Sequence, residues 1–537
     1  MSGPDERTRR FVLEERQHFS RSLIWQLQNR YFAARGVAAW SLGEVPHYVT
    51  SNPTIANSYA EMVLAFWHDR KRLANDEGDE PQYICELGAG SGRFAFHFLK
   101  RLMHLCAEAG VPPQSFRYVL TDAAEGNLEF WRAHPRFEPF FENGFLDIAR
   151  FDVAQPGELA LQISGKTIAP GVLRRPLVVF ANYLFDSVPQ DLFHFEAGRV
   201  HRCLVSLATE EEPGTLDAAE LLASVQMRYE EEEIDGLPDQ EPWLQALVAT
   251  YRRELADSHV LVPATGLRCL QSLAALSQQG LLLLSADKGE HRLAALDGKP
   301  APNLVRHGSI SLSVNYHAFT RFCTDAGGLA LVPASHHNSI NVIGLLMVGD
   351  AGRHEQLRKA YQRHVQDFGP DSFYTITKHA RKTIPEMGVD DILAYLRLSR
   401  HDSHQFGRYL PRLIELAPEF DSDMREDVVA AIDQVWETYF PLGEDLDLAS
   451  RIAALLYAMN EYPRALEYFE RAIEIYGPDT GTLYNIACCY QLTGEDAVAA
   501  AVLAKVLEHD PDNEAAKVLL AHCGRTEVQP AYASHEV

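Results

Sequence analysis

The segment Glu86–Gly92, with the sequence E-L-G-A-G-S-G, carries three glycines at alternate positions between an apolar run and an amphipathic run. Such a pattern predicts a strand, a tight turn and a helix, with a backbone that a ligand can approach closely. The dinucleotide fingerprint G-x-G-x-x-G/A fails, because Arg93 occupies its third glycine position when counting starts at Gly88. A Walker A loop is excluded because no G-K-[ST] follows. A plain strand–helix turn without a ligand is the alternative.

Short apolar runs alternate with helical patterns around this turn, which predicts an α/β fold with a doubly wound, mostly parallel sheet. The expected buried strands are Tyr83–Leu87, Phe116–Thr121, Leu177–Ala181 and Gly280–Ser285, and the expected helices are Arg93–Ala109 and Thr265–Ser277. Two later strands, Ser309–Asn315 and Ser339–Met347, are expected to flank the helix Tyr316–Ala326 and to close the sheet with an antiparallel edge.

Two segments stand apart from this alternation. Phe11–Ala34 and Thr54–Leu73 have amphipathic patterns, so we expect an N-terminal helical cap over residues 1–75, followed by the sheet domain over 76–350. Glu210–Glu241 holds twelve acidic residues and one basic residue, Arg228. It is interpreted as an acidic insertion, residues 205–245, that is partly helical. Either it attracts a basic peptide or it is a solvated acidic loop.

The C-terminal part contains an internal repeat. Ala465 and Ala499 are 34 residues apart, and apolar positions around them keep the same offset. This spacing resembles tetratricopeptide repeats, whose small residues let two helices approach closely. We expect an all-helical domain over 370–524 with repeats at 446–479 and 480–513 and a loose tail at 525–537. Ordinary antiparallel helical hairpins are the alternative. An array of this kind presents a surface that binds a protein or peptide.

The pattern E-x-G-x-G-x-G at Glu86, Gly88, Gly90 and Gly92 resembles motif I of class I S-adenosylmethionine-dependent methyltransferases. The resemblance implies S-adenosylmethionine as cofactor, with this loop under its methionine part. It also implies that Asp122, at the end of the second strand, accepts hydrogen bonds from the ribose hydroxyls, which charge would strengthen. A helix N-cap is the alternative role for Asp122.

Three further cofactor positions follow from the same resemblance. Asp152 follows Phe151 near the end of a further strand candidate, between Phe116–Thr121 and Leu177–Ala181, where an acid often meets the adenine amino group. Asp147 competes for that role. Thr50 and Ser51 are expected at the amino-acid end of the cofactor. Alternatively, these two residues cap a helix that begins near Ile55.

Colinear segments narrow the resemblance to MidA-like methyltransferases, the complex I assembly family, over about residues 12–350. Val178–Pro189 resembles the family segment A-N-E-x-x-D-A-L-P. The other matching segments are His47–Pro53, Phe193–Leu204, Gly280–Gly289 and Ser311–Gly328.

Tyr183 replaces the acidic residue that the family places after Asn182, and this puts arginine methylation in doubt. Asp186 is the remaining candidate to accept a proton from the acceptor, with Tyr183 and Asn182 beside it. For Asp186, a turn-capping role is the alternative. The resemblance implies methyl transfer to a protein side chain, with arginine as one candidate. A cofactor-binding but inactive scaffold and a small-molecule methyltransferase are the competing hypotheses.

The composition of the chain indicates which classes of binding partner and which cellular compartment to expect. The formal net charge of −25 argues against bare nucleic acid or an anionic membrane as the main ligand. The N-terminus lacks an apolar signal core and no apolar run approaches the length of a membrane span, so a cytoplasmic protein is expected. None of the eight cysteines forms a C-x-x-C pair. No metal site is predicted, and His336 and His337 are interpreted as part of a loop.

Overall fold

The computed structural model describes residues 10–73, 78–237, 241–335, 337, 339–444 and 447–523. The chain divides into two compact units, Met1–Thr375 and Ile376–Val537. The predicted tail at 525–537 and the predicted loop residue His336 lie outside the described residues.

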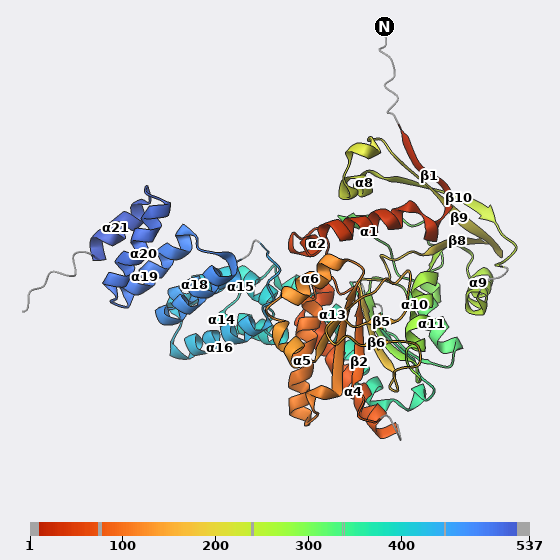
Figure 1. Ribbon diagram of the computed structural model, residues 1–537, viewed down its shortest axis with the longest axis horizontal. Helices are drawn as coiled ribbons and strands as arrows, with labels where there is room; N and C mark the ends of the chain where they lie inside the picture. The colour runs from red at the N-terminus through yellow and green to blue at the C-terminus, as the bar shows by residue number, and fades with distance from the viewer. Residues whose placement is uncertain are drawn as a thin grey trace, which may run out of the picture. The chain divides into compact units, whose positions relative to one another are not determined.

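A seven-stranded sheet forms the centre of the first unit (Figure 1), and its strand order is β15-β16-β12-β7-β2-β3-β4. The five strands from β12 to β4 run parallel, and β16 runs antiparallel to both of its neighbours. The predicted doubly wound, mostly parallel sheet is therefore confirmed. The strands are β2 (Gln82–Leu87), β3 (Phe116–Asp122), β4 (Leu146–Arg150), β7 (Leu177–Asn182), β12 (Leu281–Asp287), β15 (Leu329–Leu331) and β16 (Asn341–Met347).

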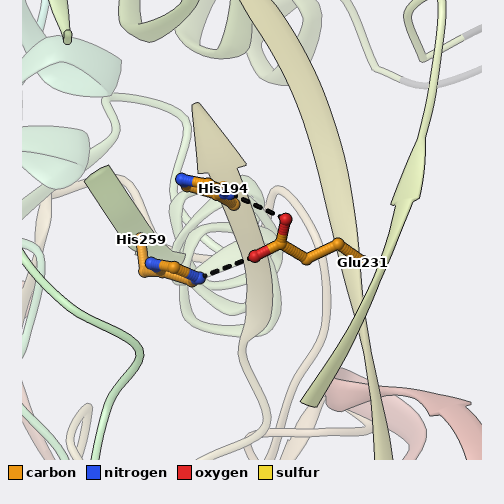
Figure 2. Close-up of side chains that lie close together, drawn as sticks. All are labelled: His194, Glu231 and His259. Carbon is orange, nitrogen blue, oxygen red and sulfur yellow. Dashed lines mark hydrogen bonds and ion pairs between the residues drawn. The ribbon is translucent and has the colours of Figure 1, made fainter. Parts of the chain in front are cut away.

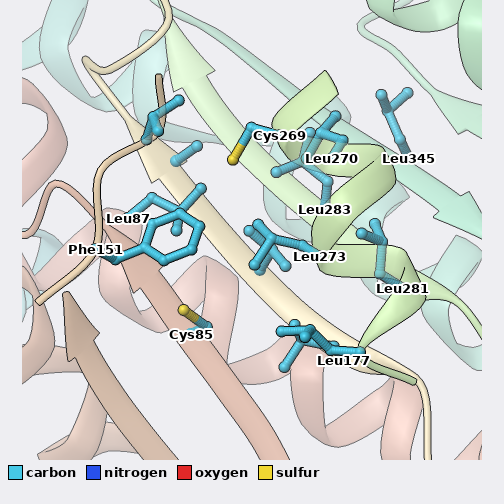
Figure 3. Packing of buried hydrophobic residues seen from close by; sticks show 14 of the residues in the cluster. Cys85, Leu87, Phe151, Leu177, Cys269, Leu270, Leu273, Leu281, Leu283 and Leu345 are labelled. Carbon is cyan, nitrogen blue, oxygen red and sulfur yellow. The ribbon is translucent and has the colours of Figure 1, made fainter. Parts of the chain in front are cut away.

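Apolar side chains cover both faces of this sheet, as its continuous apolar strands require. On one face, alternate residues of β2, β7 and β12 pack against α10 (Ala264–Ala275) and α11 (Tyr316–Asp325), and Figure 3 shows this core. On the other face, Phe180 of β7 contacts the rings of Tyr59 in α4 (Pro53–Leu73) and of Phe94 and Phe98 in α5 (Arg93–Ala109).

The predicted antiparallel edge is correct for β16 and wrong for Ser309–Asn315. Residues Ser309–Ser311 form β14, which pairs only with β13 (Val305–His307) among the described strands. The short strand β15 takes the outer position, because Leu329–Leu331 follows α11 directly and pairs with β16. Three residues with one strongly buried side chain give too little period-2 pattern to be found in the sequence.

A second, antiparallel sheet accompanies the first, with strand order β1-β9-β8-β11 and with β10 also paired to β9. Helix α1 (Leu23–Arg35) and helix α8 (Ala218–Ser224) pack on one of its faces, and α9 (Pro242–Glu254) packs on the other. The strands are β1 (Phe11–His18), β8 (Asp191–Glu196), β9 (Arg199–Thr209), β10 (Gln226–Glu233) and β11 (Asp257–Val262).

This sheet corrects two expectations. The predicted helix over Phe11–Ala34 is wrong for its first third, because β1 pairs with β9 and the helix begins only at Leu23. Ser22 caps that helix, and the carboxylate of Glu14 accepts the Leu23 N–H at 2.7 Å. The expected acidic insertion is a structural part of the same sheet, because β10 pairs with β9 over its whole length.

The second unit is helical. Its helices are α14 (Val389–Leu398), α15 (Ser403–Leu416), α16 (Ser422–Thr438), α17 (Leu448–Ala458), α18 (Tyr462–Tyr476), α19 (Thr480–Leu492), α20 (Asp496–His509) and α21 (Glu514–Cys523). Ala465 and Ala499 are fully buried at equivalent places in α18 and α20. The two buried alanines therefore keep the expected 34-residue period in structure as well as in sequence. Asp447 and Asp479, which are 32 residues apart, also cap equivalent helices, α17 and α19.

Among the described residues, no helix has both the length and the apolar composition that crossing a membrane requires.

Candidate functional site

A cavity of about 440 Å³ opens at the carboxyl ends of β2, β3, β4 and β7. The strand order reverses between β2 and β7, and open α/β sheets bind ligands at this point. The volume lies within the range of about 300–1,000 Å³ that is usual for small-molecule sites. The cavity is lined by Asn29, Arg30, Phe32, Ala33, Trp40, Gly88, Asp122, Ala123, Ala124, Asn127, Arg150, Phe151, Asp152, Val153, Tyr183, Leu184, Ser187 and Val188.

The glycine loop forms one wall and needs its glycines. Gly88, Gly90 and Gly92 have φ angles of +59°, +54° and +76°, which disfavour any residue with a Cβ. A Cβ on Gly88 would lie 2.8 Å from Leu184, and a Cβ on Gly90 would lie 2.7 Å from Trp40. The loop is thus a bare stretch of backbone beside the cavity, and Gly92 begins α5.

Asp122 joins the end of β3 to this loop. Its Oδ2 accepts the Gly90 N–H at 3.1 Å, and its Oδ1 accepts the Ala124 N–H at 2.9 Å. Burial raises the pKa of this carboxyl, and the backbone N–H donors oppose that rise. The side chain lines the cavity, so the position predicted for ribose recognition faces the predicted site.

Asp147 and Asp152, the two acids expected near the adenine, lie in different surroundings. Asp147 is fully buried inside β4, where its carboxylate accepts the N–H groups of Ile163 at 2.9 Å and Ser164 at 3.2 Å. Asp152 follows β4 and lines the cavity. Asp152 can therefore contact a ligand in the cavity, whereas Asp147 holds the loop that contains Ile163 and Ser164.

Glu86 lies at the end of β2, but its side chain points into the core. The Tyr118 hydroxyl donates a 2.7 Å hydrogen bond to its carboxylate. Burial raises the pKa of Glu86 to about 8. Glu86 is not among the described residues that line the cavity, so any contact with a cofactor would pass through the loop that it supports.

Thr50 and Ser51 are buried in the short helix α3 (Tyr48–Ser51), and both hydroxyls donate to the His47 carbonyl, at 3.2 and 2.9 Å. Neither residue belongs to the described cavity lining. The following helix α4 is capped by Asn52, whose side-chain oxygen accepts the Thr54 and Ile55 N–H groups. Asn52 therefore caps α4, a role that the sequence suggested as the alternative for Thr50 and Ser51.

The predicted acceptor side of the site follows β7. Tyr183 lines the cavity with a positive φ of 47°, an unusual conformation for a bulky residue. Asn182 accepts a 2.8 Å hydrogen bond from the Tyr59 hydroxyl, and its buried Nδ2 has no hydrogen-bond partner among the described residues. Strained backbone of this kind persists where surrounding structure enforces it, which is common in functional sites.

Asp186 lies behind this surface, outside the described cavity lining, and is only 9% exposed. Burial raises the pKa of Asp186 to about 7. Asp287, at the end of β12, is fully buried, and burial together with Asp186 raises the pKa of its carboxyl well above the ordinary range. Two neighbouring buried carboxyl groups disfavour a state in which both are ionised.

Residues of α1 and the short helix α2 (Ala38–Ser41) cover the cavity, and the sequence did not indicate them. Asn29 and Arg30 of α1 and Trp40 of α2 belong to its lining. Trp40 stacks on Phe32, with ring centroids 5.8 Å apart and an interplanar angle of 18°. Only the general expectation of an N-terminal cap pointed to this region, because contacts between remote segments leave no local motif.

Comparison with known proteins gives a family match in the second unit. Residues 456–523 match the family model of the tetratricopeptide repeat, which confirms the predicted repeats. No curated protein sequence matches the chain significantly.

Among solved structures, a COG1565 superfamily protein from Burkholderia thailandensis has 14% identity over 63% of this chain and 90% of its own, with a TM-score of 0.38. A COG1565 superfamily member from the same organism, with S-adenosyl-homocysteine bound, has 14% identity over 64% of this chain and 91% of its own, with a TM-score of 0.39. The CurJ carbon methyltransferase has 11% identity, covers 55% of this chain and 54% of its own, and has a TM-score of 0.26.

Proposed function

We propose that the first unit is an S-adenosylmethionine-dependent methyltransferase. The observation that carries this proposal is the hydrogen bond between Gly90 and Asp122 at the edge of the cavity. It joins the glycine loop, whose exposed Gly88 lines the cavity, to a carboxylate at the point where the strand order reverses. A ligand with a ribose and a small charged end, and without phosphates, matches such a wall, as the sequence resemblance implies.

The residues present fit this cofactor. Side chains at Gly88 and Gly90 would collide with Leu184 and Trp40, so this wall of the cavity requires glycine. Asp122 would accept hydrogen bonds from the ribose, and Asp152 would face the adenine. When bound, the cofactor would supply a methyl group on a sulfonium, for in-line transfer to an acceptor nucleophile with the neutral thioether as leaving group.

The chain's own contribution is orientation and removal of a proton. Alignment of the reacting groups alone can supply about 7–11 kcal/mol. Tyr183 follows β7 and lines the cavity, so it is placed to hydrogen-bond an acceptor. Asp186, with its pKa near 7, suits the acceptance of a proton at neutral pH.

We further propose a protein side chain as acceptor, recruited through the tetratricopeptide repeats. The repeats support this because such arrays bind peptides along their concave surface. The acidic residues of β10 support a basic acceptor, since four consecutive glutamates, Glu230–Glu233, lie at an exposed edge of the second sheet.

Calorimetry with S-adenosylmethionine tests the cofactor. Asp122→Asn should weaken binding about tenfold or more, because a charge-assisted hydrogen bond is lost. Glu125→Gln is the matched control, since Glu125 is an exposed carboxylate three residues further on that does not line the cavity. Absence of binding to the wild-type protein would reject the proposal.

Transfer of labelled methyl groups into a lysate, with products separated by size, tests the acceptor. Label in proteins supports the protein-acceptor proposal, and label confined to small molecules contradicts it. Cofactor binding without any transfer would identify the first unit as a scaffold.

A further inference from the structure

Two histidines and a glutamate from three strands meet on the second sheet (Figure 2). His194 comes from β8, Glu231 from β10 and His259 from β11. One nitrogen of each histidine and an oxygen of Glu231 all lie within 4.8 Å of one another. The three residues are outside the cavity described above and have no part in the proposed methyl transfer.

The register of the sheet creates this arrangement. His194 and His259 are direct cross-strand partners, so their rings point to the same side. The rings stack with centroids 4.2 Å apart and an interplanar angle of 3°. Glu231 pairs with Cys203 in β9, and its side chain reaches over β9 to the histidines on that side (Figure 2).

The glutamate presents one oxygen to each ring. His194 Nδ1 lies 2.9 Å from Oε2 and His259 Nε2 lies 3.1 Å from Oε1. Ligand atoms of a tetrahedral zinc site, with bonds of about 2.0–2.2 Å, stand roughly 3.3–3.5 Å apart. To reach that geometry, the glutamate oxygens must move outward and one ring must rotate about its side-chain bonds, because two stacked rings cannot both direct a lone pair at one ion.

The second nitrogen of His194 supplies an independent indication. Its Nε2 lies 2.8 Å from Oδ1 of Asp257. Histidines that bind a metal usually donate their other N–H to a carboxylate, which fixes the tautomer and the ring orientation. If Asp257 holds the proton on Nε2, the lone pair of Nδ1 faces the centre of the cluster.

A state in which both histidines are protonated fits the stacked rings poorly. If both histidines were protonated, two cations would face each other at 4.2 Å with one glutamate between them. A bound cation instead needs both rings neutral and uses both lone pairs. Glu231 is 38% exposed in its side chain, so an ion can reach the cluster from solvent.

We propose that His194, His259 and Glu231 bind a divalent transition-metal ion, with zinc as the best match to two imidazoles and one carboxylate. Three protein ligands leave a fourth position for water. The ion would link β8, β10 and β11. No disulfide joins these strands, because the cysteines of the described residues are free. Asp257 acts as a positioning residue for His194.

Metal-stripped full-length protein, titrated with Zn²⁺ by calorimetry and with Co²⁺ by visible spectroscopy, tests the proposal. We expect one ion per chain, a tetrahedral cobalt spectrum and a higher melting temperature with metal. His259→Gln and Glu231→Gln should each weaken binding at least tenfold, and Asp257→Asn should weaken it about 10–100-fold. His104→Gln is the matched control, because His104 forms an exposed ion pair with Glu108 alone.

The following results would overturn the metal-site proposal. Equal affinity in the wild type and both ligand variants overturns the proposal, as does an octahedral cobalt spectrum. A sulfur-to-cobalt charge-transfer band would also overturn it, because it would assign the ion to cysteines. Glu231→Gln keeps the test valid if His259→Gln does not fold, since Glu231 is partly exposed. Unchanged S-adenosylmethionine binding in the variants checks that the first sheet is intact.

Discussion

The backbone N–H of Gly90 donates a hydrogen bond to Oδ2 of Asp122, 3.1 Å away. Gly90 lies in the loop after β2, and Asp122, 32 positions later in the chain, ends the neighbouring parallel strand β3. This hydrogen bond holds the glycine loop against the Asp122 carboxylate. The two features, which the sequence predicts separately, therefore form one wall of the cavity.

Gly90→Ala should abolish measurable cofactor binding and lower the free energy of unfolding. A Cβ at a φ of +54° costs about 1–2 kcal/mol, and it would also meet Trp40 at 2.7 Å. Gly126→Ala is the control, because that glycine lies in α6 (Glu125–Ala133) with nothing within 4 Å of a Cβ. The control should gain about 0.5–1 kcal/mol in urea denaturation. Wild-type calorimetry from Gly90→Ala would contradict the assignment of this wall.

Trp40→Ala should weaken cofactor binding about tenfold, or about 1.4 kcal/mol. Trp40 lines the cavity and touches the glycine loop, so its loss uncovers the bound ligand. The effect should appear as faster dissociation in stopped-flow measurements. Trp436→Ala removes an indole from α16 in the other unit and should leave the rate unchanged. Equal rates for wild type and Trp40→Ala would show that α2 does not retain the ligand.

Glu86→Gln should flatten the pH dependence of stability. Burial raises the folded-state pKa of Glu86 from 4.5 to about 8, so between these values the unfolded state has already lost a proton that the folded state keeps. The free energy of unfolding therefore falls as pH rises through this window, by at most about 1.4 kcal/mol per pH unit from this group.

Urea denaturation across the same pH window measures the slope for the wild type, for Glu86→Gln and for the exposed control Glu125→Gln. The slope of Glu86→Gln should be smaller than that of the other two proteins. Parallel slopes for all three would mean that Glu86 is ionised in the folded state.

Ala465→Leu should destabilise the second unit by about 1–3 kcal/mol, because the larger side chain overfills a fully buried position. Hydrogen exchange of α17 and α18 amides should report the loss, while S-adenosylmethionine binding should not change. Val498→Leu is the control on the neighbouring helix, since Val498 is 41% exposed. Full protection of α17 and α18 in Ala465→Leu would argue that this alanine is not a close contact.

The central sheet and the repeats were predictable because their signals are local. Continuous apolar runs such as Leu281–Ala286 identify strands that are buried on both faces, and the 34-residue offset identifies the repeat. The glycine loop was predictable because its three glycines satisfy a backbone requirement at fixed positions.

The second sheet was not predictable in the same way. Phe11–His18 becomes a strand because it pairs with β9, almost two hundred residues later, and that pairing overrides its local pattern. The glutamates of β10 likewise look like an acidic loop until β9 is known to lie beside them. His194 and His259 are brought together by register alone, since no spacing in the sequence links them.

The position of β10 has one more consequence. Among the described strands, β10 pairs only with β9, so its other side offers free backbone hydrogen-bonding groups. Such edges invite a second molecule to add a strand and so begin aggregation. Glu230–Glu233 would place like charges directly opposite one another in an antiparallel pair of two copies. The glutamates therefore protect this protein from polymerising through its own sheet.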